Sequence, residues 1–421
     1  MKKNLLLFLM VFLPLMASSK TLKINGIWYK LSDAKAEVLK CPETTSGAVM
    51  IPKFVTHEGV KYQVTSIGKS AFQECLNVTS VTLPKGLKRI GDFAFCFCES
   101  LTSITIPGSV TSIGCSAFDS SGLTSIVIPK GVKSIGDFAF SDCGDLTSVS
   151  IGKGVTRIGN AVFRNCHALE SVSIPKNVTN IRDYAFRGCG KLYAITIPKS
   201  VTYIGKAAFC YCTYLNSINI PNNVTYIGDN AFSDCYNLRT ATIGNGVTSI
   251  GEGAFYDCKS LESISIGRGV TSIGKKAFNG CQRLSGVHIN DVAAWCNITF
   301  RGGSNPLVFA YNLYVNEELI EHLIIPEGVT AISSIAFENC DNLISVTIPK
   351  SMKSIGSFAF SICNNLKHIY CHATTPPEIN RIVEKDAYSS VTIHVPNASL
   401  EAYWEDKSWK EFKNIVPIDH W

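Results

Sequence analysis

Cysteine is the residue type in this 421-residue chain with the most chemistry to offer, since it can form disulfides, bind metals or act as a nucleophile. The chain has 17 cysteines, an odd number, so at least one has no disulfide partner within the chain. Eleven of them recur at one position of a repeating unit: Cys75, Cys98, Cys143, Cys166, Cys189, Cys212, Cys235, Cys258, Cys281, Cys340 and Cys363. Side chains that point the same way from stacked repeats disfavour a disulfide between neighbours. We therefore expect a buried column in which cysteine acts as a small apolar residue and weak donor.

The sequence motifs give little indication of a metal site or of a catalytic site. Cys96 and Cys98, and likewise Cys210 and Cys212, could be a metal-binding pair, but each is a column cysteine with an adjacent one, and no Cys-x-x-Cys pair precedes a histidine pair. The chain also lacks Gly-x-Ser-x-Gly, a phosphate-binding glycine loop and His-Glu-x-x-His. We predict a protein that is not an enzyme and has no cofactor and no metal.

The cysteines belong to a unit built around Ile-Gly-x-x-Ala-Phe. Twelve copies start at Ile67, Ile90, Ile113, Ile135, Ile158, Ile181, Ile204, Ile227, Ile250, Ile273, Ile332 and Ile355. The period is 23 residues, except that one step is a residue short and the step from Ile273 to Ile332 contains an extra block. A fixed period of this length is typical of a solenoid.

Each unit has a pattern that predicts its own chain reversals. Leu101, Ile104 and Ile106 show the spacing L-x-x-L-x-L, and a proline follows. We expect a strand, a turn, a second extended leg and a short helical or 3₁₀ turn, with glycine supplying unusual backbone angles. The predicted fold is a leucine-rich repeat solenoid with parallel strands on one face and short helical or 3₁₀ turns on the other, capped at both ends. Stacked coils would align their apolar positions into internal columns.

The repeat resembles that of the BspA-like family of bacterial surface proteins, whose consensus runs Ile-Gly-x-x-Ala-Phe-x-x-Cys-x-x-Leu-x-x-Ile-x-Ile-Pro. The resemblance covers roughly residues 22–421. It includes an N-terminal cap with Gly26-Ile27-Trp28-Tyr29 and a C-terminal cap with Tyr403, Trp409 and Phe412. The resemblance implies a cell-surface or secreted role in adhesion to host matrix proteins or to other cells, without enzymatic activity.

The chain begins as a secretory signal peptide does, with Lys2 and Lys3 before an apolar stretch from Leu5 to Met16, and we expect cleavage after Ser19. That stretch is too short to span a bilayer, which takes about 20 apolar residues, and no later segment approaches this length. We predict a signal peptide at 1–19, an N-terminal cap at 20–66, repeats at 67–289, an aromatic-rich insert at 290–319, repeats at 320–370 and a C-terminal cap at 371–421. The net charge of +6 is mild and no run of like charges occurs, so we exclude nucleic acid as a partner.

Outward-facing strand positions are the first candidates for ligand contact. Most are Ser or Thr, which fits solvated strand residues but also a hydroxyl-lined surface that binds sugar or protein. Larger side chains are better anchors. They replace Ser and Thr at Tyr193, Asn216, Asn219, Arg239, His288, His322, His368 and Tyr370. His322 and His368 occupy equivalent positions two coils apart, a separation of about 9.6 Å.

Two further candidates lie off the strands. The residue after the strand-ending turn is basic in many copies: Lys85, Lys130, Lys153, Lys176, Lys199, Arg268 and Lys350. This stripe is either a solvated edge balanced by the recurring acidic residues or a site for polyanions. The insert holds Trp295 and Phe300 and either packs as a satellite cluster or presents a binding loop.

We interpret the chain as an exported adhesion or protein-interaction module whose partner is a host matrix protein or another cell surface. A surface protein that binds host or dietary glycans is the alternative from another class. A structural surface protein without a specific ligand is the third.

Overall fold

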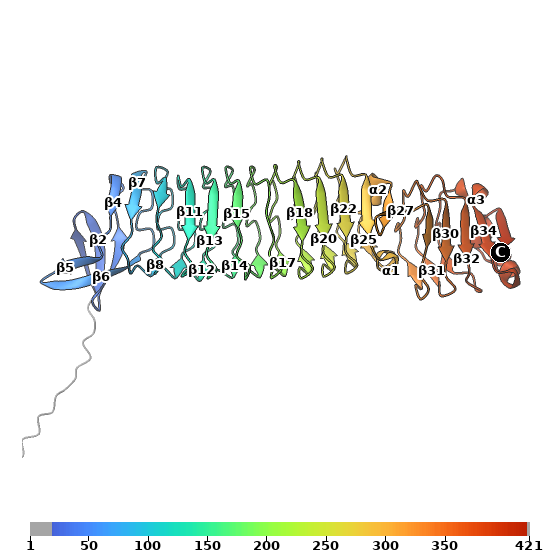
Figure 1. The fold of residues 1–421 in the computed structure, drawn as a ribbon, viewed down its shortest axis with the longest axis horizontal. Coiled ribbons are helices and arrows are strands. Elements are labelled where there is room, and N and C mark those ends of the chain that lie inside the picture. The colour runs from blue at the N-terminus through green and yellow to red at the C-terminus, as the bar shows by residue number, and fades with distance from the viewer. Residues whose placement is uncertain (1–18, 419–421) are drawn as a thin grey trace, which may run out of the picture.

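The computed structural model describes residues 19–418, so the predicted signal peptide lies, apart from Ser19, outside the described residues. Figure 1 shows an elongated body in which coils follow one another along the long axis. The N-terminal region opens it with antiparallel pairs (β1 with β2, β2 with β3, β5 with β6), and β3 and β4 then pair in parallel with later strands. These strands are β1 (Lys20–Ile24), β2 (Ile27–Ser32), β3 (Lys35–Lys40), β4 (Ser46–Met50), β5 (Phe54–His57) and β6 (Val60–Ile67).

Each repeat contributes two legs to parallel sheets. The first legs carry β7 (Asn77–Thr82), β9 (Ser103–Ile104), β11 (Ser125–Ile128), β13 (Ser148–Ile151), β15 (Ser171–Ser173), β18 (Ser217–Ile220), β20 (Thr240–Ile243), β22 (Ser263–Ile266) and β24 (Gly286–Ile289). The second legs carry β8 (Arg89–Ile90), β10 (Ser112–Ile113), β12 (Ser134–Ile135), β14 (Arg157–Ile158), β16 (Asn180–Ile181), β17 (Tyr203–Ile204), β19 (Tyr226–Ile227), β21 (Ser249–Ile250) and β23 (Ser272–Ile273). Partners are equivalent residues of successive coils, such as Ile227 with Ile250, which confirms the predicted parallel solenoid.

The arc that follows each second leg differs from the expected helical or 3₁₀ turn. Within residues 67–289 it consists of turns with two left-handed residues four positions apart, for example Ala161 (φ 51°) and Asn165 (φ 57°). The second left-handed position directly precedes the column position, and Asp, Asn or Gly often occupies it because these residues tolerate positive φ best. The chain therefore reverses by left-handed residues rather than by a helix.

The glycine after each second leg also has a different role from the one predicted. Its φ is not in the left-handed region at Gly228, but a Cβ there would lie 2.4 Å from the carbonyl carbon of Gly205 in the preceding coil. The glycine is therefore needed for close approach of two backbones. Arg182 and Ser333 stand at the equivalent positions of two coils, so the approach is not equally tight everywhere.

The core consists of columns that run through the stack. Ten phenylalanines from Phe72 to Phe278 stack face to face with centroid distances between 4.9 and 5.7 Å. Beside them the cysteine column is buried and reduced, as predicted. Cys166 Sγ donates to the carbonyl oxygen of Phe140 at 3.1 Å, and most members repeat this bond. These thiols thus link neighbouring coils without a disulfide.

The insert is neither a satellite nor a projecting loop. It comprises α1 (Val292–Cys296), β25 (Thr299–Phe300), α2 (Leu307–Ala310), β26 (Leu313–Val315) and β27 (Glu318–Leu319). β25 pairs with β23 and β26 pairs with β24, so the insert forms an enlarged coil within the stack. Its core residue is Trp295, which is 1% exposed and donates its indole N–H to the carbonyl oxygen of Ala336 at 2.8 Å.

Beyond the insert the stack continues to the C-terminal region. Its elements are β28 (His322–Ile324), β29 (Ala331–Ile332), β30 (Ser345–Ile348), β31 (Ser354–Ile355), β32 (His368–Cys371), β33 (Glu378–Ile379), α3 (Ala387–Ser390), β34 (Thr392–Val395), η1 (Asn397–Ser399), α4 (Leu400–Glu405), η2 (Trp409–Glu411) and β35 (Asn414–Pro417). β34 and β35 extend the parallel sheet of β28, β30 and β32. Trp409 and Tyr403 are fully buried over its end and donate to the carbonyl oxygens of Pro377 and Ala373.

Candidate binding surface

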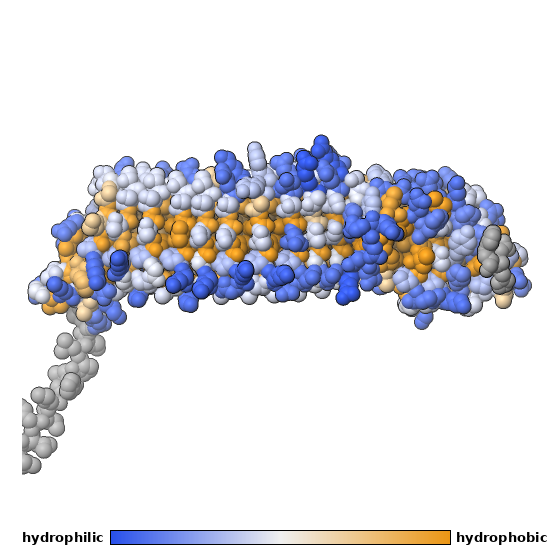
Figure 2. Space-filling view, in the orientation of Figure 1, coloured by the Kyte–Doolittle hydropathy of each residue, from blue (hydrophilic) through white to orange (hydrophobic). Residues whose placement is uncertain are grey.

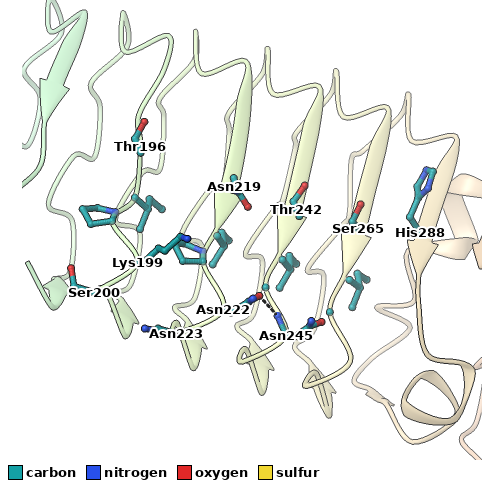
Figure 3. Close-up of a pocket in the computed structure, with 18 of the residues that line it drawn as sticks. Thr196, Lys199, Ser200, Asn219, Asn222, Asn223, Thr242, Asn245, Ser265 and His288 are labelled. Carbon is teal, nitrogen blue, oxygen red and sulfur yellow. Dashed lines mark hydrogen bonds between the residues drawn. The ribbon is translucent and has the colours of Figure 1, made fainter. Parts of the chain in front are cut away.

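The outward-facing residues of the first legs form straight rows because equivalent residues pair in register. Asn219 pairs with Thr242, Thr242 with Ser265, and Ser265 with His288. Neighbouring strands lie about 4.8 Å apart, so each row presents one side chain at every such step. Figure 3 shows Thr196, Asn219, Thr242, Ser265 and His288 as one row on successive coils.

A groove of about 1230 Å³ runs along this row from residue 172 to residue 317. Isoleucines that end the first legs line it together with the row itself, among them Ile220, Ile243 and Ile266. Lys176 and Lys199 also belong to its lining. Figure 3 shows Lys199 with Asn222, Asn223 and Asn245 in a second line beside the row. The predicted contact residues Asn219 and His288 therefore share one groove with two members of the basic stripe.

His288 closes the groove towards the insert. Its ring stacks on Tyr314 with centroids 4.6 Å apart, and its Nδ1 lies 3.0 Å from a carboxylate oxygen of Glu317. Both rings lean over Gly286, where a Cβ would lie 3.1 Å from His288 Nε2 and 3.2 Å from the Tyr314 ring. Gly286 thus gives the two rings room to lie across the strand face.

A second group of rings lies on the strand face beyond the insert. Tyr370 stacks on His394 at 4.4 Å between centroids, and His368 Nδ1 lies 3.1 Å from His394 Nε2. We call His368, Tyr370 and His394 the C-terminal aromatic cluster. Ile324 lies in the row that contains Tyr370 and His394, in register with Thr347 and Tyr370, and is 67% exposed. His322 pairs with Ser345, which pairs with His368, so these two histidines lie two coils apart.

The remaining predicted contact residues of the strand face, Tyr193, Asn216 and Arg239, occupy equivalent positions of three successive coils, and the backbone N–H groups of Asn216 and Arg239 donate to the carbonyl oxygens of Tyr193 and Asn216. Tyr193 is 57% exposed on a coil whose first leg forms no regular strand, and Asn216 follows one coil later. Arg239 lies 3.6 Å from Glu262. The prediction that Trp295 contacts a ligand is wrong because the indole is buried, and Phe300 is half-buried and packs against it at 5.3 Å between centroids.

The basic stripe lies on exposed positions: Lys85, Lys130, Lys153, Lys176, Lys199, Arg268 and Lys350. It is interrupted at Asn222 and Asn245, whose side-chain oxygens accept backbone N–H groups of Asn245 and Arg268 in the following coils. The recurring aspartates have a similar structural role. Asp137 and Asp183 accept the backbone N–H groups of Asn160 and Lys206. These carboxylates therefore stabilise coil stacking.

Two residues of the strand face beyond the insert, His394 and Ile324, were not predicted from the sequence. His394 lies in Val391-Thr392-Ile393-His394-Val395-Pro396, which repeats the alternation and final proline of a first leg and could have been recognised by it. Ile324 is the outward residue of a first leg at which most repeats carry a polar residue. Its place in one row with Tyr370 and His394 becomes apparent only once the register is known.

The thiols of the cysteine column are expected to be unreactive, because they are buried and protonated. Burial raises the pKa of Cys98 to about 12 and that of Cys166 well above its ordinary value. Among residues 19–418, no group of three or more His, Cys, Asp or Glu could hold a metal ion. In the same part of the chain, no helix is long and apolar enough to cross a membrane.

Coils with one parallel strand face, a 23-residue period and Leu, Ile and Phe columns define a solenoid of leucine-rich repeats. The chain belongs to the family of proteins with a BspA-type leucine-rich repeat region, whose model matches residues 65–193, 179–305 and 309–398. Comparison with curated protein sequences finds no match. Solenoids of this family are typically not enzymes.

The chain is also similar to several solved structures. A leucine-rich repeat protein from Bacteroides ovatus is 28% identical with a TM-score of 0.59, and the alignment covers 94% of this chain and 99% of that one. A leucine-rich cell surface protein from Faecalibacterium prausnitzii is 28% identical with a TM-score of 0.48, covering 84% of this chain and 95% of that one. The pneumococcal vaccine antigen PcpA is 18% identical with a TM-score of 0.48, over 95% and 99%.

Proposed function

We propose that this chain is an exported bacterial surface protein that adheres to a protein partner through the strand face beyond the insert. The observation that carries the proposal is the C-terminal aromatic cluster beside the exposed Ile324. Aromatic and apolar side chains on a rigid parallel sheet are the kind of anchor that dominates protein interfaces. Leucine-rich repeat proteins are generally protein-interaction modules.

Export rests on the N-terminal sequence and on the relatives. Lys2, Lys3 and the apolar stretch up to Met16 have the order of a signal peptide. The relative from Faecalibacterium prausnitzii is described as a cell surface protein. N-terminal sequencing of the protein recovered from the cell envelope or the culture medium is expected to begin at Lys20. Recovery of the uncleaved chain from the cytoplasm would contradict export.

The binding proposal is tested with the full chain and immobilised laminin, collagen and fibronectin. Saturable binding to a matrix protein is expected for the native chain. The double substitution Ile324→Ser and Tyr370→Ala is expected to weaken it about a hundredfold or more, since truncated hot-spot residues cost about 2 kcal/mol each. Val127→Ser is the matched control because Val127 is 64% exposed on the strand face of a distant coil. Equal loss in both variants would contradict the assignment of the surface.

A further inference from the structure

One edge of the groove, continued by the two coils that precede the groove, carries only positive charge. The connecting segments between first and second legs at 129–134, 152–157, 175–180, 198–203, 221–226, 244–249 and 267–272 contain no Asp or Glu. The residues that supply positive charge there are Lys130, Lys133, Lys153, Arg157, Lys176, Lys199 and Arg268. Four consecutive coils each place a lysine at the same position. Stacking aligns these lysines at steps of about 4.8 Å.

The acidic residues of the repeats do not neutralise this edge, and the acidic residue of the groove lining, Glu317, lies beside His288 at the end near the insert. Asp137 and Asp183 come after the second leg, at the end of it opposite to Lys130 and Lys176, and both are engaged by backbone N–H groups of the next coil. Among the ion pairs of residues 19–418, none includes a lysine of the stripe. Within the described residues, the lysines of the stripe therefore have no ion-pair partner that would compete with an anionic ligand.

The groove beside these lysines favours a polyhydroxylated chain over a polypeptide. Ser173, Thr196, Asn219, Thr242 and Ser265 supply hydroxyl or amide groups on five successive coils. The lining contains no Phe, Tyr or Trp, and its isoleucines offer only a nearly buried apolar floor. Figure 2 shows this face with apolar colour along the middle and hydrophilic colour along its long edges. A protein partner would lack the aromatic anchors that it finds beyond the insert.

We propose that this groove binds a linear anionic polysaccharide that lies along the solenoid axis. Its carboxylates or sulfates meet Lys176 and Lys199, and its hydroxyls exchange hydrogen bonds with the row from Ser173 to Ser265. An extended pyranose chain repeats on the scale of the coil spacing, so successive sugars meet successive coils. His288, stacked on Tyr314, closes the groove and sets where the chain ends or turns away. This site is separate from the protein-binding surface proposed above.

The experiment measures binding of the full chain to heparin, hyaluronan and neutral dextran by surface plasmon resonance at two salt concentrations. Binding to an anionic polysaccharide that weakens with salt is expected, with none to dextran. Lys176→Gln together with Lys199→Gln is expected to raise the Kd about tenfold and to reduce the salt dependence. Lys350→Gln together with Lys353→Gln removes the same charge from an edge outside the groove and is expected to change the Kd less than about twofold.

A second variant separates a groove from a merely basic edge. Thr196→Val with Thr242→Val keeps shape and all charges but removes two hydroxyls, and it is expected to raise the Kd about fivefold. Equal effects of the two lysine pairs, or no effect of the threonine pair, would overturn the groove as the site. Absence of binding to either anionic polysaccharide at low salt would overturn the ligand class. The ligand class would also be overturned if Lys176→Gln with Lys199→Gln abolished binding to matrix proteins but left binding to the polysaccharide unchanged.

Discussion

The phenylalanine column offers a quantitative test of how coils are held together. Phe186 is fully buried between Phe163 at 5.5 Å and Phe209 at 5.4 Å between centroids, with interplanar angles of 15° and 8°. An aromatic pair contributes about 0.5–1.5 kcal/mol beyond the area that it buries. Phe186→Leu breaks two pairs, so the ring contacts account for about 1–3 kcal/mol of the expected destabilisation. The smaller side chain adds a cost for imperfect packing.

The ring contribution can be isolated by a double-mutant cycle. Urea unfolding followed by circular dichroism would compare Phe163→Leu, Phe186→Leu and the double variant, with an expected coupling of about 0.5–1.5 kcal/mol. Phe186→Leu with Phe255→Leu is the control, because two rings separate these positions and their costs should add within about 0.5 kcal/mol. A coupling near zero for the adjacent pair would refute the argument, since the rings would then stabilise only through buried area.

Other predictions concern the glycines and the cysteines. Gly228→Ala should destabilise the chain by about 1–3 kcal/mol in urea because its Cβ meets the backbone of the preceding coil, whereas Gly144→Ala, with nothing within 4 Å, should be neutral or slightly stabilising. Equal midpoints would contradict this. Cys166→Ser should cost about 1 kcal/mol and less than Cys166→Ala, because a hydroxyl can still donate to the neighbouring carbonyl; thermal unfolding that ranks them oppositely would exclude a role for that bond. Iodoacetamide at neutral pH should alkylate the exposed Cys115 and leave the column intact, by mass spectrometry of the folded protein. Burial raises the folded-state pKa of the column thiols. Their contribution to the free energy of unfolding is therefore complete below the unfolded pKa of about 8.5, and it is lost as the pH rises above that value. Stability that stays level from pH 8 to pH 11 would contradict that linkage.

The serine prediction also shows how the structure changes an expectation from the sequence. A hydroxyl buried at a column position would be costly if it had no partner. The coil that carries Ser121 shows how a hydroxyl fits there, since Ser121 Oγ lies 3.4 Å from Cys143 Sγ. The cost is therefore expected to be small, because a serine at position 166 keeps a partner across the coils.

The sequence by itself determined the solenoid, its period and its columns, because a side chain that recurs every 23 residues must stack on its own equivalents once one coil is formed. It also placed Asn219, His288 and the lysines on outward positions. The alternation within each leg decides the direction of a side chain locally.

Only the tertiary structure decided what these residues meet. The burial of Trp295, the closing of the groove by His288 and Tyr314, and the meeting of His368 with His394 all depend on where a later coil lies over an earlier one. The same holds for the aspartates, which face the next coil and leave the lysine edge unbalanced. A periodic sequence encodes one coil many times, but contacts at its irregular positions arise only when coils from distant parts of the chain pack against each other.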